Sequence, residues 1–236
     1  MVGDLPSVEE LQNPKSNLAT VIYSSDDKIL GKYYNENRVN ITFKDLDKDL
    51  TTALVATEDA RFYEHSGVDI KALARAVSGV VTGGSKGGGS TITQQLAKMM
   101  FPREELNKFQ LAIRKMKEWV IATRLEKNYT KEEIMAMYLN KFDFLHLAVG
   151  IKSAAKIYFN VSPDSLRLEQ AAMLVGMAKN PSLFDPLKRP DKTLQRRNVV
   201  MMQMVKYGYL TKERYDSLKK LPLSLVYRPE DHNDGP

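Results

Sequence analysis

Residues 56–70 read ATEDARFYEHSGVDI and form a charged junction between two predicted helices. The stretch begins at the last residue of the apolar run 53–56. It ends where apolar residues take up helical spacing, with Asp69 in the position of an N-cap. Its acidic and imidazole side chains are Glu58, Asp59, Glu64, His65 and Asp69. A Glu-Asp pair at such a junction suits either a helix end with solvated charges or a catalytic carboxylate.

The sequence on either side of this junction also carries helical patterns. Thr130 and Glu133 form a capping box, and Asn180-Pro181 ends a helix. Four apolar residues recur at helical spacing in one segment, Phe109, Ile113, Met116 and Val120. The first expected helix begins at Leu46 and the second at Asp69. A third begins at Ser90 or Thr91 and is interrupted by Pro102, a long one runs from about Glu104 to Lys127, and another begins at Thr130. Four further expected helices cover 147–158, 166–179, 191–207 and 211–220.

Two segments have other patterns. Residues 19–34 predict a β-hairpin around the turn 25–28, because two runs of β-branched and aromatic residues flank polar ones. Residues 82–90 (TGGSKGGGS) hold five glycines and predict a loop. The expected fold is therefore mainly α, with a short N-terminal β-hairpin.

Length and composition suit one domain with a buried core, alone or with appendages, since 43% of the 236 residues are hydrophobic. The absence of Cys excludes disulfides and thiolate metal sites. The longest apolar run, 171–178, is shorter than the ~18–20 residues that span a bilayer, and the N-terminus lacks the pattern of a signal peptide. If the parent protein is membrane-anchored, its N-terminal anchor is expected to be absent from this chain.

The net charge of +6 lies mostly in one segment. Residues 98–131 hold nine Lys or Arg against four Glu, with aliphatic, Met and aromatic residues between them. Such a segment is either a solvated helix face or a surface for anionic lipid headgroups or a diphosphate. A nucleic-acid partner is not expected, because the interleaved residues are mostly aliphatic or Met rather than stacking aromatics.

Several short patterns are expected to be accidental. Residues 83–87 fit G-x-S-x-G but follow a helix rather than a strand, and the S-x-x-K patterns at 25–28 and 217–220 have no K-T-G after them. A zinc site is disfavoured, because the chain has three His and too few ligands beside them. No firm metal site is expected, and a weak, oxygen-ligated Mg²⁺ at Glu58 and Asp59 stays open.

A second carboxylate stands out in RKMKEW, residues 114–119. Glu118 follows Arg114 by four residues and Lys115 by three, so the three side chains share a helix surface. The arrangement is either an ordinary ion pair or, together with Glu58, half of a catalytic carboxylate pair.

Five motifs in order resemble the family 51 glycosyltransferases, the peptidoglycan polymerase domains of class A penicillin-binding proteins and monofunctional transglycosylases. The motifs are ATEDARFYEHSGVD (56–69), GGSTITQQLAK (88–98), RKMKEWVIATRLE (114–126), YLNKF…GIKSAAKIYF (138–159) and LVGMAKNPSLFDPLKRP…RRN (174–198). The resemblance implies a lysozyme-like helical domain with a small membrane-facing lobe. It divides the chain into a linker with the hairpin (1–45), a glycosyltransferase domain (46–220) and the start of a connection to a missing C-terminal domain (221–236).

The resemblance also implies an activity. Lipid II would be polymerised into glycan strands at the outer, periplasmic face of the bacterial cytoplasmic membrane, with inversion at the MurNAc anomeric carbon and release of polyprenyl diphosphate. The resemblance implies no required cofactor and leaves open whether Mg²⁺ takes part. It implies that moenomycin inhibits the enzyme. By matching positions, Glu58 is the general base and Glu118 the second catalytic Glu. The implied substrate-binding residues are Asp59, Phe62, His65, Ser90, Thr91, Gln95, Lys98, Arg114, Lys115 and Lys179.

The sequence departs from the family in two places. Met99 stands where the family usually has Asn, and Leu145 and Val149 stand where it has Gly and Tyr. Two other functions stay open. One is a lytic transglycosylase or muramidase on the same fold, which would need no cationic cluster, and the other is a non-catalytic membrane-surface module that uses 98–131 alone.

Overall fold

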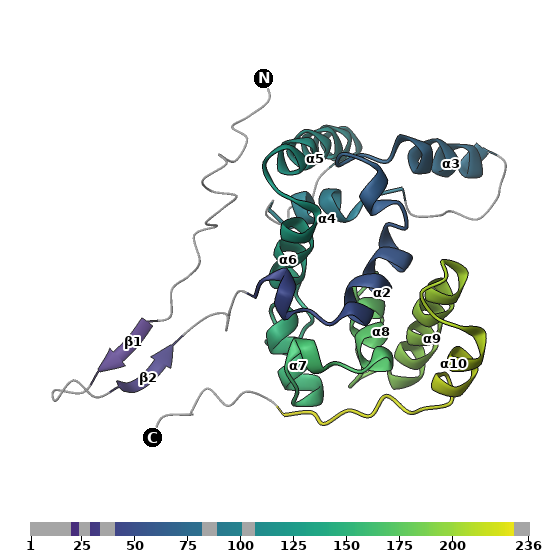
Figure 1. The fold of residues 1–236 in the computed structure, drawn as a ribbon. Coiled ribbons are helices and arrows are strands. Elements are labelled where there is room, and N and C mark those ends of the chain that lie inside the picture. Colours follow the sequence, from purple (N-terminus) through teal and green to yellow (C-terminus); the bar gives the residue numbers. More distant parts are fainter. Residues whose placement is uncertain (1–19, 24–28, 34–40, 82–88, 101–106, 229–236) are drawn as a thin grey trace.

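The computed structural model describes residues 20–23, 29–33, 41–81, 89–100 and 107–228. The chain is mainly helical, as predicted (Figure 1). Its elements are β1 (Thr20–Tyr23), β2 (Ile29–Tyr33), the 3-10 helix η1 (Phe43–Asp45), α2 (Lys48–Glu58), η2 (Phe62–Glu64), α3 (Ile70–Val81), α4 (Ile92–Lys98), α5 (Lys108–Asn128), α6 (Lys131–Lys141), α7 (Ile151–Phe159), η3 (Pro163–Ser165), α8 (Leu168–Met177), α9 (Pro190–Lys206) and α10 (Lys212–Leu218).

The predicted N-terminal hairpin is confirmed. Strands β1 and β2 pair antiparallel, with Thr20 opposite Tyr33 and an irregularity at Tyr23, which pairs with Ile29. The predicted turn at 25–28 lies outside the described residues, as do residues 82–88 of the predicted glycine loop and Pro102.

Helix α8 forms the centre of the core. Every residue from Leu168 to Met177 is buried, and α2 and α9 pack beside it in the lower half of Figure 1. A helix that is buried on all sides is stable only when other elements enclose it. The run that is too short to span a membrane is therefore the central core helix, and no described helix is long and apolar enough to cross a bilayer.

Helix α2 carries the first candidate carboxylate to the edge of this core. Asp47 caps its start by accepting hydrogen bonds from the backbone N–H groups of Asp49 and Leu50. Leu50, Ala53 and Leu54 are fully buried against the core. The helix ends at Glu58, where the backbone leaves helical geometry at Asp59.

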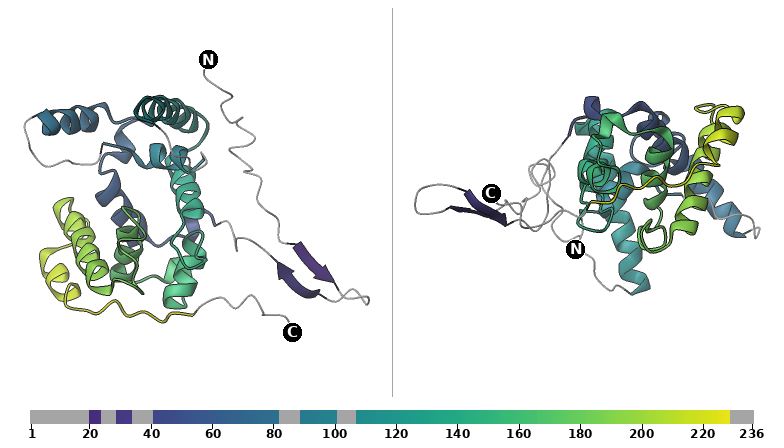
Figure 2. Two further views of the ribbon diagram at one scale, coloured as in Figure 1. Left: turned by 180° about the vertical axis from the view of Figure 1, so that it is seen from behind. Right: turned by 90° about the horizontal axis from the view of Figure 1, so that it is seen from below.

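Helices α3 and α5 lie at the end of the molecule opposite α7 and α10 (Figures 1 and 2). The predicted N-cap of α3 is confirmed, because Asp69 Oδ1 accepts a hydrogen bond from the Ala72 N–H at 2.9 Å. The long helix α5 starts at Lys108 behind an Asn107–Gln110 capping box, while its predicted start at Glu104 lies outside the described residues. The capping box predicted at Thr130 and Glu133 is confirmed at the start of α6.

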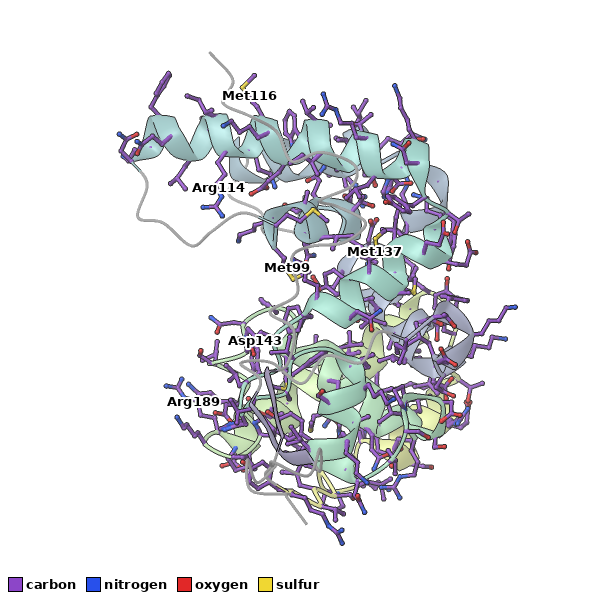
Figure 3. The ribbon with its side chains drawn as sticks, turned by 90° about the vertical axis from the view of Figure 1, so that its left-hand side faces the viewer. Met99, Arg114, Met116, Met137, Asp143 and Arg189 are labelled. Carbon is purple, nitrogen blue, oxygen red and sulfur yellow. The ribbon has the colours of Figure 1, made fainter. Side chains whose placement is uncertain are left out.

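One side of α5 is an apolar stripe exposed to solvent, formed by Phe109, Ile113, Met116 and Val120. These four residues recur at helical spacing and are 74%, 38%, 65% and 45% exposed. Figure 3 shows Met116 pointing away from the rest of the molecule, whereas Arg114 points from the other side of α5. The buried face of α5 consists instead of Glu118, Ile121, Ala122 and Leu125. We call the four exposed residues Phe109, Ile113, Met116 and Val120 the α5 stripe.

The prediction that a helix covers 147–158 is wrong at its start, because α7 begins at Ile151. Leu145, His146 and Leu147 all have positive φ, from +50° to +66°, which an α-helix excludes. A hydrogen bond from the Phe144 N–H to the Ala148 carbonyl closes this turn at 2.9 Å. Leu145 thus occupies, as a branched residue, a left-handed position that Gly adopts without strain.

Candidate active site

Glu58 lies at the end of α2 with each carboxylate oxygen held by a different helix. Its Oε2 accepts a hydrogen bond from Gln95 Nε2 of α4 at 3.0 Å, and its Oε1 lies 3.4 Å from Arg196 Nη2 of α9. Tyr138 of α6 donates its hydroxyl hydrogen bond to Gln95 Oε1 at 3.2 Å, which fixes the amide. The Glu58 side chain is 14% exposed, so one carboxylate is held in a fixed orientation near the surface of the core.

Asp59 faces a different set of partners from Glu58. Its carboxylate lies 3.0 Å from His65 Nε2 and accepts a hydrogen bond from the Ile92 N–H at 3.1 Å. The His65 carbonyl accepts a hydrogen bond from Lys131 Nζ at 2.7 Å. Asp59 and His65 therefore join the loop after α2 to the start of α4 and to α6, and their contact with substrate stays a prediction.

Phe62 and Thr91 are buried beneath the same loop. The Phe62 ring is fully buried, with Lys131 Nζ 4.4 Å from its centroid. Thr91 donates its hydroxyl hydrogen bond to the Gly67 carbonyl at 2.7 Å and caps α4 by accepting from the Gln94 N–H. Gly67 has a φ of +90°, and a Cβ there would lie 2.8 Å from the Ala122 backbone of α5. This position therefore requires glycine for the loop to approach α5.

Glu118 forms a second carboxylate cluster, on the buried face of α5. Its Oε2 lies 2.9 Å from Lys115 Nζ, which also donates a hydrogen bond to Ser90 Oγ at 3.0 Å. The side chain of Glu118 is 5% exposed and that of Lys115 is 38% exposed. A buried carboxylate thus holds a partly exposed ammonium beside a hydroxyl, which is a suitable arrangement for binding an anion.

Helix α4 connects the two clusters. Ser90 and Thr91 precede its first turn, Gln95 lies in its middle, and Ser90 and Gln95 contact the Glu118 and Glu58 clusters respectively. Only five positions separate Ser90, which lies just before the N-cap Thr91, from Gln95 of the same short helix, so the two contact points stay near each other. The structure therefore brings Glu58, Gln95, Ser90, Lys115 and Glu118 into one region around α4.

The three remaining predicted cations lie on separate elements. Lys98 is exposed at the end of α4, one turn after Gln95, and Lys179 is exposed just beyond α8. Figure 3 shows Arg114 directed from α5 toward the side of the molecule where Met99, Asp143 and Arg189 lie. The predicted substrate contacts of these cations stay predictions.

Burial and the charge of Glu58 set the protonation of its neighbours. Burial raises the pKa of Tyr138 far above its ordinary value, and the negative charge of Glu58 raises it further, so Tyr138 remains a hydrogen-bond donor. Burial lowers the pKa of Arg196 from its ordinary value, and the charge of Glu58 opposes that shift. Glu58 therefore faces one cation and one neutral amide.

The weak Mg²⁺ site considered at Glu58 and Asp59 has few free oxygens. Asp59 directs its carboxylate to His65 and Ile92, while Glu58 faces Gln95 and Arg196. Across the described part of the chain, no three His, Cys, Asp or Glu side chains are grouped so that they could hold a metal ion.

Sequence reasoning missed two residues of the Glu58 cluster, Arg196 and Tyr138. Both lie inside the motifs that resemble the family, at 138–159 and 174–198, but the sequence predicted no role for either residue. Arg196 follows Glu58 by 138 positions, and no periodicity links residues that far apart. Met99, one of the departures, caps the end of α4 and packs partly buried against the core.

Chemically, the region combines a fixed carboxylate with an ammonium held by a second carboxylate. The first can accept a proton from a nearby hydroxyl group. The second, with the neighbouring cations, can neutralise an anionic leaving group. Such a pair suits a reaction in which a hydroxyl group attacks and an anionic group leaves.

Comparison with known proteins shows the family of the chain. Residues 26–205 match the family model described as Transglycosylase. The chain is 37% identical over 224 residues to penicillin-binding protein 1A of Escherichia coli, covering 94% of this chain and 26% of that protein. It is 38% identical over 223 residues to penicillin-binding protein 1A/1B of Bacillus subtilis, covering 94% and 24% respectively. The chain thus spans about a quarter of the length of these relatives.

A solved structure supports the fold. The crystal structure of penicillin-binding protein 1A from Haemophilus influenzae superposes with a TM-score of 0.50 at 22% identity, covering 90% of this chain and 22% of that chain. The mainly helical architecture predicted from the sequence is therefore confirmed as the fold of this neighbour. The likeness to lysozyme and the position of a lobe at the membrane stay predictions.

Proposed function

The chain belongs to the transglycosylase family, and we propose that it is a peptidoglycan glycosyltransferase that polymerises lipid II into glycan strands. The observation that carries the proposal is the pair of carboxylate clusters joined by α4, one facing an amide and an arginine and the other holding Lys115. The family match supports the reaction class, and the two clusters supply the chemistry that this reaction requires.

Glu58 acts as the general base in this proposal. The acceptor is the 4-hydroxyl of a GlcNAc residue, whose high pKa requires a positioned base. As Glu58 takes the hydroxyl proton, the acceptor oxygen forms a bond to the MurNAc anomeric carbon. The bond from that carbon to the diphosphate oxygen breaks on the opposite face. One displacement with opposite-face attack inverts the anomeric centre.

The second cluster stabilises the leaving group. Polyprenyl diphosphate leaves as an anion, so its charge needs neutralising more than its oxygen needs a proton. Lys115, held by Glu118 and Ser90, supplies one fixed cation. Arg114 and Lys98 lie on the same two helices and supply further positive charge.

The α5 stripe supports a position at a membrane surface. Four large apolar side chains point to solvent from a helix that also carries several Lys and Arg. Such a face can enter the boundary between headgroups and acyl chains while its cations contact anionic lipids. We propose that the chain works at the outer, periplasmic face of the bacterial cytoplasmic membrane, where its lipid-linked substrate lies.

No cofactor is needed in this scheme, because the side-chain cations themselves face the leaving group. Turnover should therefore continue when a chelator removes divalent cations. Turnover that stops with the chelator and returns with Mg²⁺ would place a metal at the diphosphate or at Glu58 and Asp59.

The experiment that tests the function is product analysis with labelled lipid II. The proposal predicts glycan strands longer than the substrate, whose formation stops when moenomycin is added. Release of shorter sugars from cell-wall glycan instead would identify a lytic transglycosylase or muramidase. Vesicle binding without any turnover would identify a non-catalytic membrane-surface module.

A further inference from the structure

Two adjacent arginines on α9 have different surroundings. Arg197 is fully buried and directs its guanidinium to backbone carbonyls, including those of Pro222 and Leu221 at 2.9 and 2.8 Å. It thereby fastens the segment after α10 to α9. Arg196 points the other way, across α8 toward Glu58, and contacts none of those carbonyls in the described structure.

Arg196 reaches Glu58 along a path that α8 keeps open. Its Nε donates a hydrogen bond to the Gly176 carbonyl at 3.3 Å, and its guanidinium carbon lies 5.8 Å from the centroid of the Phe184 ring. A Cβ on Gly176 would lie 3.1 Å from Arg196 Cγ, a tighter contact than side chains normally make. The absence of a side chain at position 176 therefore lets the arginine lie against α8 with its guanidinium at Glu58.

The ion pair lies mostly away from solvent. The side chains of Arg196 and Glu58 are 11% and 14% exposed. A charge in such a place is stable only with a partner, and removing one member of a buried pair leaves the other uncompensated. Without Arg196, Glu58 would retain only the neutral amide of Gln95 among the hydrogen-bond partners described for it.

We propose that Arg196 is a positioning residue for Glu58, which rests on the proposed role of Glu58 as the general base. Arg196 holds Oε1 while Gln95, itself held by Tyr138, holds Oε2. The carboxylate is thereby fixed in one plane, where it can accept the proton of the acceptor hydroxyl. Arg196 keeps its own proton throughout, so its part in the reaction is orientation and charge, not proton transfer.

Two substitutions separate this role from a merely structural one. Arg196→Met removes the charge at similar length, and Arg196→Lys restores a cation without the planar fork. Steady-state rates with lipid II and thermal unfolding are measured for both variants. Arg196→Met should lower kcat on the order of 10²-fold, as expected for a misplaced catalytic group, with a far smaller change in KM. Arg196→Lys should recover about tenfold of that loss.

Arg197→Lys is the matched control, since it alters a neighbouring buried arginine that fastens the C-terminal segment. It should lower the unfolding temperature while the folded molecules keep the wild-type kcat. If Arg196→Met does not fold, Arg196→Gln gives the answer, because it removes the charge and keeps a side-chain amide that can donate to the Gly176 carbonyl. Arg196→Gln should then lower kcat while the protein stays folded.

The proposal is overturned if folded Arg196→Met retains the wild-type kcat, or if its loss of activity equals the fraction unfolded. It is also overturned if Arg196→Met does not fold and folded Arg196→Gln retains the wild-type kcat. Wild-type protein that makes no glycan from lipid II would instead overturn the proposed function. An active wild type with an equally active Arg196→Met variant would overturn only the role of Arg196.

Discussion

Replacing Phe109 and Met116 with Ser should weaken binding of the chain to lipid vesicles. Both residues belong to the α5 stripe and are seven positions apart, so they lie on one side of the helix. They are 74% and 65% exposed, so the fold does not depend on burying them. The double variant therefore removes apolar surface from the proposed membrane contact without opening a cavity in the core.

The size of the effect follows from the exposed fractions. Burying a whole Phe or Met side chain stabilises by about 1.5–3 kcal/mol. Since between two thirds and three quarters of each side chain is exposed, a membrane that covered both would gain about 2–4 kcal/mol from the pair. At 1.4 kcal/mol per tenfold change, the vesicle affinity of the double variant should fall by about 30-fold or more.

Partitioning onto vesicles that contain anionic lipid measures this change, with thermal unfolding as a check on the fold. The matched control is Val199→Ser with Met202→Ser, two apolar residues of α9 that are 45% and 37% exposed. The control should bind vesicles as the wild type does. Equal binding by the α5 double variant, or an equal loss in the α9 control, would refute a membrane contact through the α5 stripe.

Three further predictions concern stability. Arg197→Met should lower the free energy of unfolding by about 3 kcal/mol or more, because the backbone carbonyls after α10 lose the charged donor that the fully buried Arg197 supplies. Denaturant titration showing a negligible loss would contradict this. Burial of Asp185 favours its neutral form, but hydrogen bonds from His146 and from two backbone N–H groups outweigh burial and hold its pKa below the ordinary 3.8. Asp185 therefore stabilises the fold above about pH 4 and loses this contribution as the pH falls through its lowered pKa. The difference in free energy of unfolding between the wild type and Asp185→Asn should shrink in acid. A difference that does not change with pH would contradict this prediction. Leu147→Gly should raise the free energy of unfolding by about 1 kcal/mol, because Leu147 is half exposed and its φ of +65° strains a branched residue. An unchanged or lower midpoint of denaturant unfolding would contradict this.

Local signals in the sequence predicted the starts of several helices. Asp69, Thr91 and Thr130 all cap helices as expected, because a cap depends on atoms within three or four residues. The contact between Lys115 and Glu118 is local in the same way, since three positions on a helix bring side chains together.

The contacts that complete the site are not local. Gln95 of α4 meets Glu58 at the end of α2, and Lys115 meets Ser90 because α4 and α5 pack together. The resemblance to a family supplied the identity of these residues but not their hydrogen bonds. Arg196 received no role for the same reason, because its partner lies on another helix.

Backbone conformation explains the one helix whose start was wrongly predicted. Residues 147–150 have apolar character that fits a helix, but the chain turns through three left-handed residues before α7 begins. The pattern of apolar side chains predicts which residues are buried but not the sign of φ. The left-handed turn could therefore not be predicted from its branched residues. The domain limits at 45 and 220 stay predictions, and residues 226 and 228 donate backbone hydrogen bonds to α7.

We propose that Glu58 is the general base of lipid II polymerisation, and one substitution tests this role directly. Glu58→Gln keeps the size of the side chain and its hydrogen bond to Gln95 or Arg196 but cannot accept the proton. The decisive measurement is glycan synthesis from labelled lipid II by folded Glu58→Gln beside the wild type. Glycan strands are expected from the wild type and none from the variant. Chain growth by the variant at a near wild-type rate would contradict this role.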